Sequence, residues 1–275
     1  MITRDNYFQY FKYSIYILLT LNFYFFFKED VAALTIRFPD GVSFDQIINA
    51  YATSIDTVAW LILVWILELE TYILEEDQIT PTMEYISIVI RAVCYGFIAY
   101  AFFGYCFTLL FYYDTNAIQE TDLCSLANGA WTYSQMIGEY TPISVENCTI
   151  LSTSNEFLRY GSTSAIVDIS GAKDIIWLGW IDVINSGVWI IVVAIIELNI
   201  KLQEKNIKKN LSQKLSQFNQ YILYPILFIN AFYWGLEGDF VDFWDAFLWL
   251  VAFIFIELNL FLEKSQPSLL PMFLP

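Results

Sequence analysis

The sequence has no histidine and little positive charge among its 275 residues. Without histidine, haem, zinc or copper sites that depend on imidazole ligands are excluded, and so is the commonest general base of enzymes. Lysine and arginine number 13 against 29 aspartate and glutamate residues, and the formal net charge is -16. Nucleic acids and anionic lipids are bound by clustered basic side chains, so this balance argues against both as partners.

Apolar residues are abundant instead. They make up 57% of the chain, charged residues only 15%, and the mean hydropathy is +0.52. A soluble domain of this length would lack the polar side chains needed to cover its surface. The sequence therefore predicts an all-α, polytopic membrane protein. It contains no phosphate-binding glycine loop and no G-x-S-x-G motif, so we expect no enzymatic activity, no metal site and no cofactor.

One pattern occurs three times at fixed spacing. A polar residue is followed four positions later by tryptophan, and the tryptophan eight positions later by glutamate. The residues between tryptophan and glutamate are almost all apolar, which is typical of a membrane-spanning helix with a carboxylate near its end. The three copies are Asp56, Trp60 and Glu68; Asn185, Trp189 and Glu197; and Asp245, Trp249 and Glu257.

The repeating unit is predicted to be a pair of helices. Residues 9–26 align without gaps with residues 217–234, so each repeated helix has a preceding partner. Six spans follow, arranged as three parallel helix hairpins, at about 10–28, 53–74, 84–113, 176–202, 217–236 and 240–263. The predicted divisions are a first helix pair at 1–76 with an interfacial segment at 29–52, a second at 77–205, a third at 206–264, and an apolar, proline-rich tail at 265–275.

Lysine and arginine predict the orientation of these spans. Nine of them fall on one predicted side and four on the other. The positive-inside rule then places both termini in the cytoplasm, within a plasma membrane or bacterial inner membrane.

The long polar insertion at 114–174 is expected on the opposite, extracytoplasmic side. It is rich in Ser, Thr, Asn and Gly and contains Cys124 and Cys148 without a C-x-x-C spacing. In an oxidising compartment, such a pair predicts a disulfide that stabilises a small cap.

The three glutamates lie near the cytoplasmic ends of their helices, where a charge facing lipid would be unfavourable. They are expected to point into the bundle, either for pairing between helices or as an ion or proton pathway. Lys12 and Arg91 are candidate counter-charges in the first two hairpins, whereas the third has Gln220 at that position.

Polar and aromatic side chains mark the opposite ends of the same helices. Acidic residues there either cap backbone N–H groups or form a vestibule that attracts cations. These residues are Asp56, Asp182, Asn185, Asp242 and Asp245, and one turn further in Trp60, Trp189 and Trp249 are predicted to form an aromatic belt.

The sequence favours a non-enzymatic integral-membrane protein, an accessory or scaffold subunit that packs against other membrane chains or a second copy. Its 24 Phe, 19 Tyr and 9 Trp residues offer surface for lipid, pigment or another subunit. The alternative is a small cation or proton channel or transporter that uses Glu68, Glu197 and Glu257. A membrane enzyme acting on lipid ranks third.

Overall fold

The computed structural model describes residues 4–69, 80–118, 122–127, 129–152, 154, 156–204 and 209–265. The chain forms two compact units. One unit comprises residues 1–22 and 192–275, and the other comprises residues 23–191. Each unit is described by itself below.

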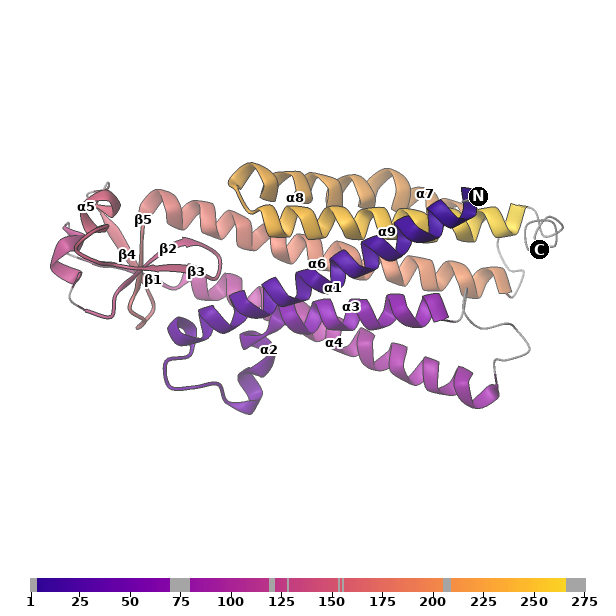
Figure 1. The fold of residues 1–275 in the computed structure, drawn as a ribbon, viewed down its shortest axis with the longest axis horizontal. Coiled ribbons are helices and arrows are strands. Elements are labelled where there is room, and N and C mark those ends of the chain that lie inside the picture. Colours follow the sequence, from indigo (N-terminus) through magenta and orange to yellow (C-terminus); the bar gives the residue numbers. More distant parts are fainter. Residues whose placement is uncertain are drawn as a thin grey trace. The chain divides into compact units, whose positions relative to one another are not determined.

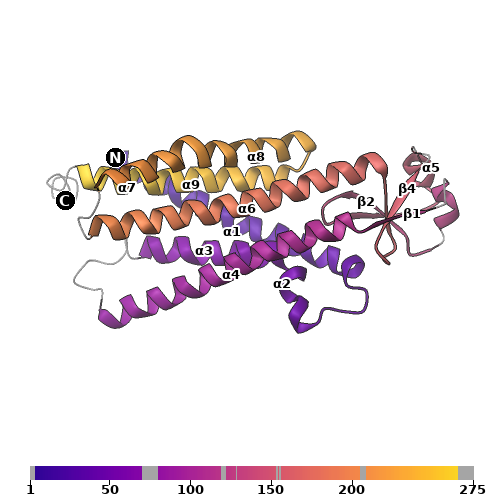
Figure 2. The same cartoon turned by 180° about the vertical axis from the view of Figure 1, so that it is seen from behind.

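The described residues of the 23–191 unit form four α-helices and part of two longer ones. Apolar residues dominate these helices. Thr80 caps the helix that begins at Pro81, because its side chain accepts a 3.3 Å hydrogen bond from the Met83 N–H. Figures 1 and 2 show α3 and α4 side by side. The helices are the end of α1 (Arg4–Arg37), α2 (Ile47–Ala50), α3 (Ala52–Glu68), α4 (Pro81–Tyr113), α5 (Cys148–Leu151) and the start of α6 (Ile169–Glu204).

Between α4 and α6 the chain forms a five-stranded sheet, in the order β1-β4-β5-β2-β3. All pairs are antiparallel except β2 with β5, which are parallel. Figure 1 shows the sheet beyond the end of α4 and the start of α6. The strands are β1 (Thr115–Ile118), β2 (Thr132–Met136), β3 (Glu139–Pro142), β4 (Phe157–Tyr160) and β5 (Ala165–Asp168).

Alternation along β5 gives the sheet two apolar faces. Ala165 and Val167 pack with Tyr112 at the end of α4, whereas Ile166 packs with Cys148 on the other side. The disulfide between Cys124 and Cys148 lies on that second side and links α5 to a short 3-10 turn. One face of the sheet is therefore covered by helix ends and the other by a cross-linked loop.

In the other unit, α7 (Lys209–Phe218) leads through a π-helical turn, Asn219–Leu223, into α8 (Tyr224–Glu237). Gly238 ends α8 with a φ of 94°, a left-handed conformation that glycine adopts without strain. α9 (Phe240–Ser265) begins two residues later and lies beside α8 (Figure 2).

The described parts of all six stretches predicted to span a membrane are helical, but fewer of these helices are long and apolar enough to cross one. Within the described residues, α4 and residues 169–199 of α6 are long and apolar enough to cross a membrane, and α2 with α3 would make a third span if the bent pair counts as one. In α1, tyrosine, asparagine and lysine side chains lower the hydropathy, and α8 is only 14 residues long. The six-span repeat therefore stays a prediction.

The cap confirms one expectation and corrects another. The predicted disulfide between Cys124 and Cys148 is present. The expectation of an all-α fold is wrong in this segment, because the insertion folds as a sheet. Its strands are only four or five residues long, and two of the four pairings, β1 with β4 and β2 with β5, join segments more than thirty residues apart, so they leave little local pattern.

Candidate functional site

The most unusual backbone feature of the 23–191 unit is a sharp bend between α2 and α3. The two helix axes meet at 78°, and Tyr51 between them leaves the helical conformation with φ −129° and ψ 35°. Gly104 of α4 packs against this bend so closely that a Cβ atom there would lie 2.6 Å from the Ala52 Cβ. The bend is therefore held against α4 at a position that only glycine fits.

The start of α3 is capped by a carboxylate from another helix. Tyr51 offers no side-chain cap, and Asp30 of α1 takes that role. Its Oδ2 accepts hydrogen bonds from the Ser54 backbone N–H at 3.0 Å and from the Ser54 hydroxyl at 2.6 Å. Burial raises the pKa of Asp30 to about 6, against the opposing effects of these bonds and of the Arg37 charge.

Further polar contacts join the same three helices. The Tyr105 hydroxyl donates to Asp56 Oδ2 at 3.2 Å, linking α4 to α3. Arg37 donates to the Thr108 hydroxyl at 2.9 Å and lies 5.6 Å from the Phe111 ring, linking α1 to α4. We call this set the α3-start cluster; its members are Asp30, Arg37, Ser54, Asp56, Tyr105 and Thr108.

The cluster is connected to the sheet by a pair of tyrosines. The hydroxyls of Tyr112 and Tyr140 lie 2.9 Å apart, and the Gly138 N–H donates to the Tyr112 oxygen at 2.9 Å. Burial raises the pKa of Tyr140 well above its ordinary value, so its hydroxyl stays protonated. This contact fixes the β2–β3 turn on the end of α4.

The predicted glutamates are distributed over both units. Glu68 lies in α3 and is only 1% exposed. Glu197 is half-buried in α6, within the other unit. The side chain of Glu257 in α9 lies outside the described residues. The structure therefore does not test whether the three act together.

Asp245 is joined to two donors in its own unit. Its Oδ1 accepts from the Asn22 amide at 2.8 Å, which links α9 to α1, and the Trp249 side chain one turn later also bonds to it. The remaining predicted polar residues, Asp182, Asn185 and Asp242, are half-buried. In this unit a repeated polar position thus makes a contact between helices.

The tryptophans of the repeat lie inside the protein. Trp60, Trp189 and Trp249 are between 7% and 8% exposed. Trp60 and Trp189 pack edge to face with ring centroids 6.1 Å apart. These tryptophans therefore pack against protein, and their place in an aromatic belt stays a prediction.

The two predicted counter-charges, Lys12 and Arg91, differ in burial. Lys12 is 6% exposed, with its ammonium 5.1 Å from the ring of Tyr13. Arg91 is half-buried on α4. Because Lys12 and Glu68 belong to different units, their predicted pairing is not tested.

A second buried polar stripe follows α7 into the π-helical turn. Ser212, Ser216 and Asn219 succeed one another at helical spacing, all at most 6% exposed. The Asn199 amide of α6 donates to the Ser216 hydroxyl at 3.1 Å. Among the residues that the structure describes, neither polar atom of the Asn219 amide has a hydrogen-bond partner.

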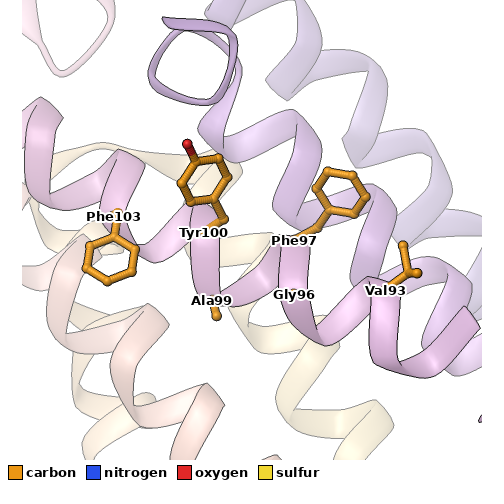
Figure 3. Close-up of a pocket in the computed structure, with 6 residues that line it drawn as sticks. All are labelled: Val93, Gly96, Phe97, Ala99, Tyr100 and Phe103. Atoms are coloured by element: carbon orange, nitrogen blue, oxygen red, sulfur yellow. The ribbon is translucent and has the colours of Figure 1, made fainter. Parts of the chain in front are cut away.

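An apolar groove of about 400 Å³ lies on the exposed side of α4. A Cβ atom built on Gly96 would meet nothing within 4 Å, so this glycine leaves a notch between aromatic rings. Figure 3 shows the rings of Phe97 and Tyr100 standing on the same side of the helix. The groove is lined by Val93, Gly96, Phe97, Ala99, Tyr100 and Phe103.

The sequence pattern identified Asp56 but missed its neighbours in the α3-start cluster. Asp30 and Arg37 follow the first apolar run without any spacing that links them to α3, and Tyr105 is one of many aromatic residues in α4. Within the described ranges, no group of three or more Cys, Asp or Glu side chains could hold a metal ion. Comparisons with protein-family models, with curated proteins and with solved structures give no match.

Proposed function

We propose that this chain is a non-enzymatic integral-membrane protein, an accessory or scaffold subunit that packs against other membrane chains or a second copy of itself. The observation that carries the proposal is that the protein's own fold buries only a small part of each candidate membrane span. Only 17% of the most apolar stretch of α4 and 22% of that of α6 is buried. Most of these surfaces therefore face lipid or another chain.

The groove on α4 is the best candidate contact within this surface. Helices in membranes associate where small residues let backbones approach, since lipid and apolar side chains are equally apolar. Gly96 and Ala99 provide such a site, flanked by exposed aromatic rings. The contacts of Asp30, Asp56 and Asp245 support a packing role for these acids, because each one joins two helices.

The test is purification in mild detergent with identification of co-purifying chains. Gly96→Leu fills the notch from a position where a Cβ meets nothing within 4 Å, so it should release the partner without lowering the unfolding temperature. Ile88→Phe adds bulk at a 58% exposed position of α4 outside the groove and serves as the control. A partner retained equally by both variants would contradict the proposal.

The proposed topology keeps six spans as three helix pairs, with both termini cytoplasmic and the sheet outside. Cys124 and Cys148 support this side for the sheet, because disulfides persist in oxidising compartments. A cysteine placed at Val145, which is 73% exposed, should react with a membrane-impermeant maleimide in intact cells. A cysteine at Leu211 in α7 should react only after permeabilisation.

A cation or proton pathway is the second candidate function, and two observations favour it. Glu68 is 1% exposed in an apolar helix, and that helix belongs to a bent pair. Broken helices and intramembrane carboxylates occur together in transporters. Reconstituted protein should then carry a cation or proton flux that Glu68→Gln and Glu257→Gln reduce, and absence of flux in the unmodified protein would exclude this function.

A further inference from the structure

Phe44 is the most exposed large apolar side chain among the described residues. It is 92% exposed, against 73% for Val145 and Ile150, the next in rank. It lies in a 3-10 turn, Phe44–Gln46, directly before α2, and Figure 1 shows this turn projecting away from α3. A phenylalanine ring left in water forgoes the roughly 1.5–3 kcal/mol that its burial would contribute.

The turn is well ordered by its own hydrogen bonds. The Ser43 N–H donates to Gln46 Oε1 at 3.1 Å, and the Gln46 N–H donates to the Ser43 carbonyl at 2.9 Å. These bonds between Ser43 and Gln46 fix the backbone of the turn that carries Phe44. Ile47, three residues later and 38% exposed, lies on the same side of the short helix at helical spacing.

The bend at Tyr51 determines how this segment meets a membrane. Helices that cross a bilayer tilt by about 20° from its normal. If α3 crosses in this way, the 78° angle places α2 close to the membrane plane. Asp40 and Asp45 are exposed beside Phe44, and such charges require water or headgroups. The segment thus presents apolar and charged side chains together, as surface-bound helices do.

We propose that residues 43–50 form a membrane-surface anchor, in which Phe44 and Ile47 insert at the boundary between headgroups and acyl chains. The partner is a zwitterionic lipid surface, because the exposed charges of the segment are acidic and Arg37 already bonds to Thr108. Gly104 and Asp30 then set the depth of the anchor, since they fix the bend that joins it to α3. The inference requires α3 to cross a membrane and holds for a scaffold and a transporter alike.

The experiment places the photo-crosslinker p-benzoylphenylalanine at single positions of the full chain in native membranes or phosphatidylcholine vesicles. Position 44 tests the anchor. Position 88, 58% exposed on the candidate span α4 and outside the groove, is the positive control, and position 145, 73% exposed on the sheet segment, is the negative control. All three side chains are exposed, so the substitutions leave the fold intact. Lipid adducts at position 44 should exceed those at position 145 by about tenfold.

Lipid adducts at positions 44 and 88 but not 145 would support the anchor. Adducts at 88 combined with a protein adduct or no adduct at 44 would overturn it, while leaving the membrane span and the proposed function intact. Absence of lipid adducts at both 44 and 88 would overturn the anchor together with its premise that the chain spans a membrane.

Discussion

α3 and α9 occupy equivalent places in the sequence repeat, yet they begin in different ways. The first turn of α9 is capped locally, because Asp239 immediately precedes the helix and its Oδ1 accepts from the Asp242 N–H at 3.1 Å. The N–H of the third residue of α3, that of Ser54, donates at 3.0 Å to Asp30, which lies 24 residues earlier on α1. The free N–H groups of the first turn are therefore capped by the preceding residue in α9 and by a residue of another helix in α3.

This difference makes the start of α3 depend on tertiary structure. α9 carries its own cap and follows a tight turn at Gly238. α3 follows a sharp bend that needs both the Asp30 carboxylate and the close approach of Gly104. We therefore expect changes outside α3 to destabilise its first turn, whereas α9 should respond mainly to changes in its own residues.

The largest effect is expected for Gly104→Ala. The new Cβ would lie 2.6 Å from the Ala52 Cβ and 3.0 Å from the Ile48 carbonyl oxygen, so the α2–α3 bend must move away from α4. Such overpacking costs about 2–3 kcal/mol of the free energy of unfolding. Thermal or denaturant unfolding in detergent measures this loss.

Gly96→Ala on the same helix is the matched control, since its Cβ meets nothing within 4 Å. Alanine has the higher helix propensity, so this variant should be unchanged or more stable by up to about 1 kcal/mol. Equal losses for both variants would show that helix propensity in α4, rather than the contact at the bend, decides the outcome.

Removal of the two caps should give the next largest effect. Asp30→Ala leaves the buried Ser54 N–H and hydroxyl without their acceptor, which costs about 2 kcal/mol. Asp239→Ala removes an ordinary local cap, at a cost of about 1 kcal/mol. Hydrogen exchange should become faster in the first turn of α3 for the former and of α9 for the latter. Faster exchange in both helices with either variant would refute the distinction between them.

The pH dependence of stability sharpens the same comparison. Burial raises the pKa of Asp30 from 3.8 to about 6, so the folded protein holds this proton more tightly than the unfolded chain. The resulting stabilisation is fully present below the unfolded pKa and is lost as the pH rises through about 6. Raising the pH from about 5 to about 7 should therefore lower the free energy of unfolding by about 1 kcal/mol through this group.

Denaturant unfolding of the unmodified protein and of Asp30→Asn at several pH values measures this contribution. The asparagine keeps an acceptor for the Ser54 N–H but does not titrate in this range. The difference between the two proteins should therefore change with pH. Parallel curves would mean that the Asp30 carboxyl has the same pKa in the folded and unfolded chains.

Local sequence features predicted the parts of this fold that depend on near neighbours. The six apolar runs form helices, and the isolated cysteine pair in a polar insertion forms a disulfide. The sheet was missed because β2 pairs with β5, about thirty residues later, through strands of four or five mixed residues. The burial of the three tryptophans within the protein was not predicted, because periodicity alone does not distinguish a face toward lipid from a face toward another helix.

The candidate site follows the same rule. Asp56 could be identified because the repeat places it one turn before Trp60. Its donor Tyr105 and the neighbouring Asp30 could not, because they reach α3 through packing of separate helices. The positions of such partners depend on crossing angles and on Gly104, which a linear pattern does not specify.

The smallest effect concerns the repeated acids themselves. Asp56 accepts from a tyrosine at 3.2 Å, whereas Asp245 accepts from the Asn22 amide at 2.8 Å and also bonds to Trp249. Hydrogen bonds between membrane helices contribute about 0.6 kcal/mol on average. Tyr105→Phe should therefore destabilise the protein by about that amount. Asn22→Leu removes a shorter bond from a side chain that is only 4% exposed, so it should cost more, up to about 1.7 kcal/mol.

A double-mutant cycle pairing each variant with alanine at its aspartate isolates the two bonds. A larger coupling energy for Tyr105 and Asp56 than for Asn22 and Asp245 would reverse this order, and would mean that the cluster around the bend stabilises the helices more than the contact at α9.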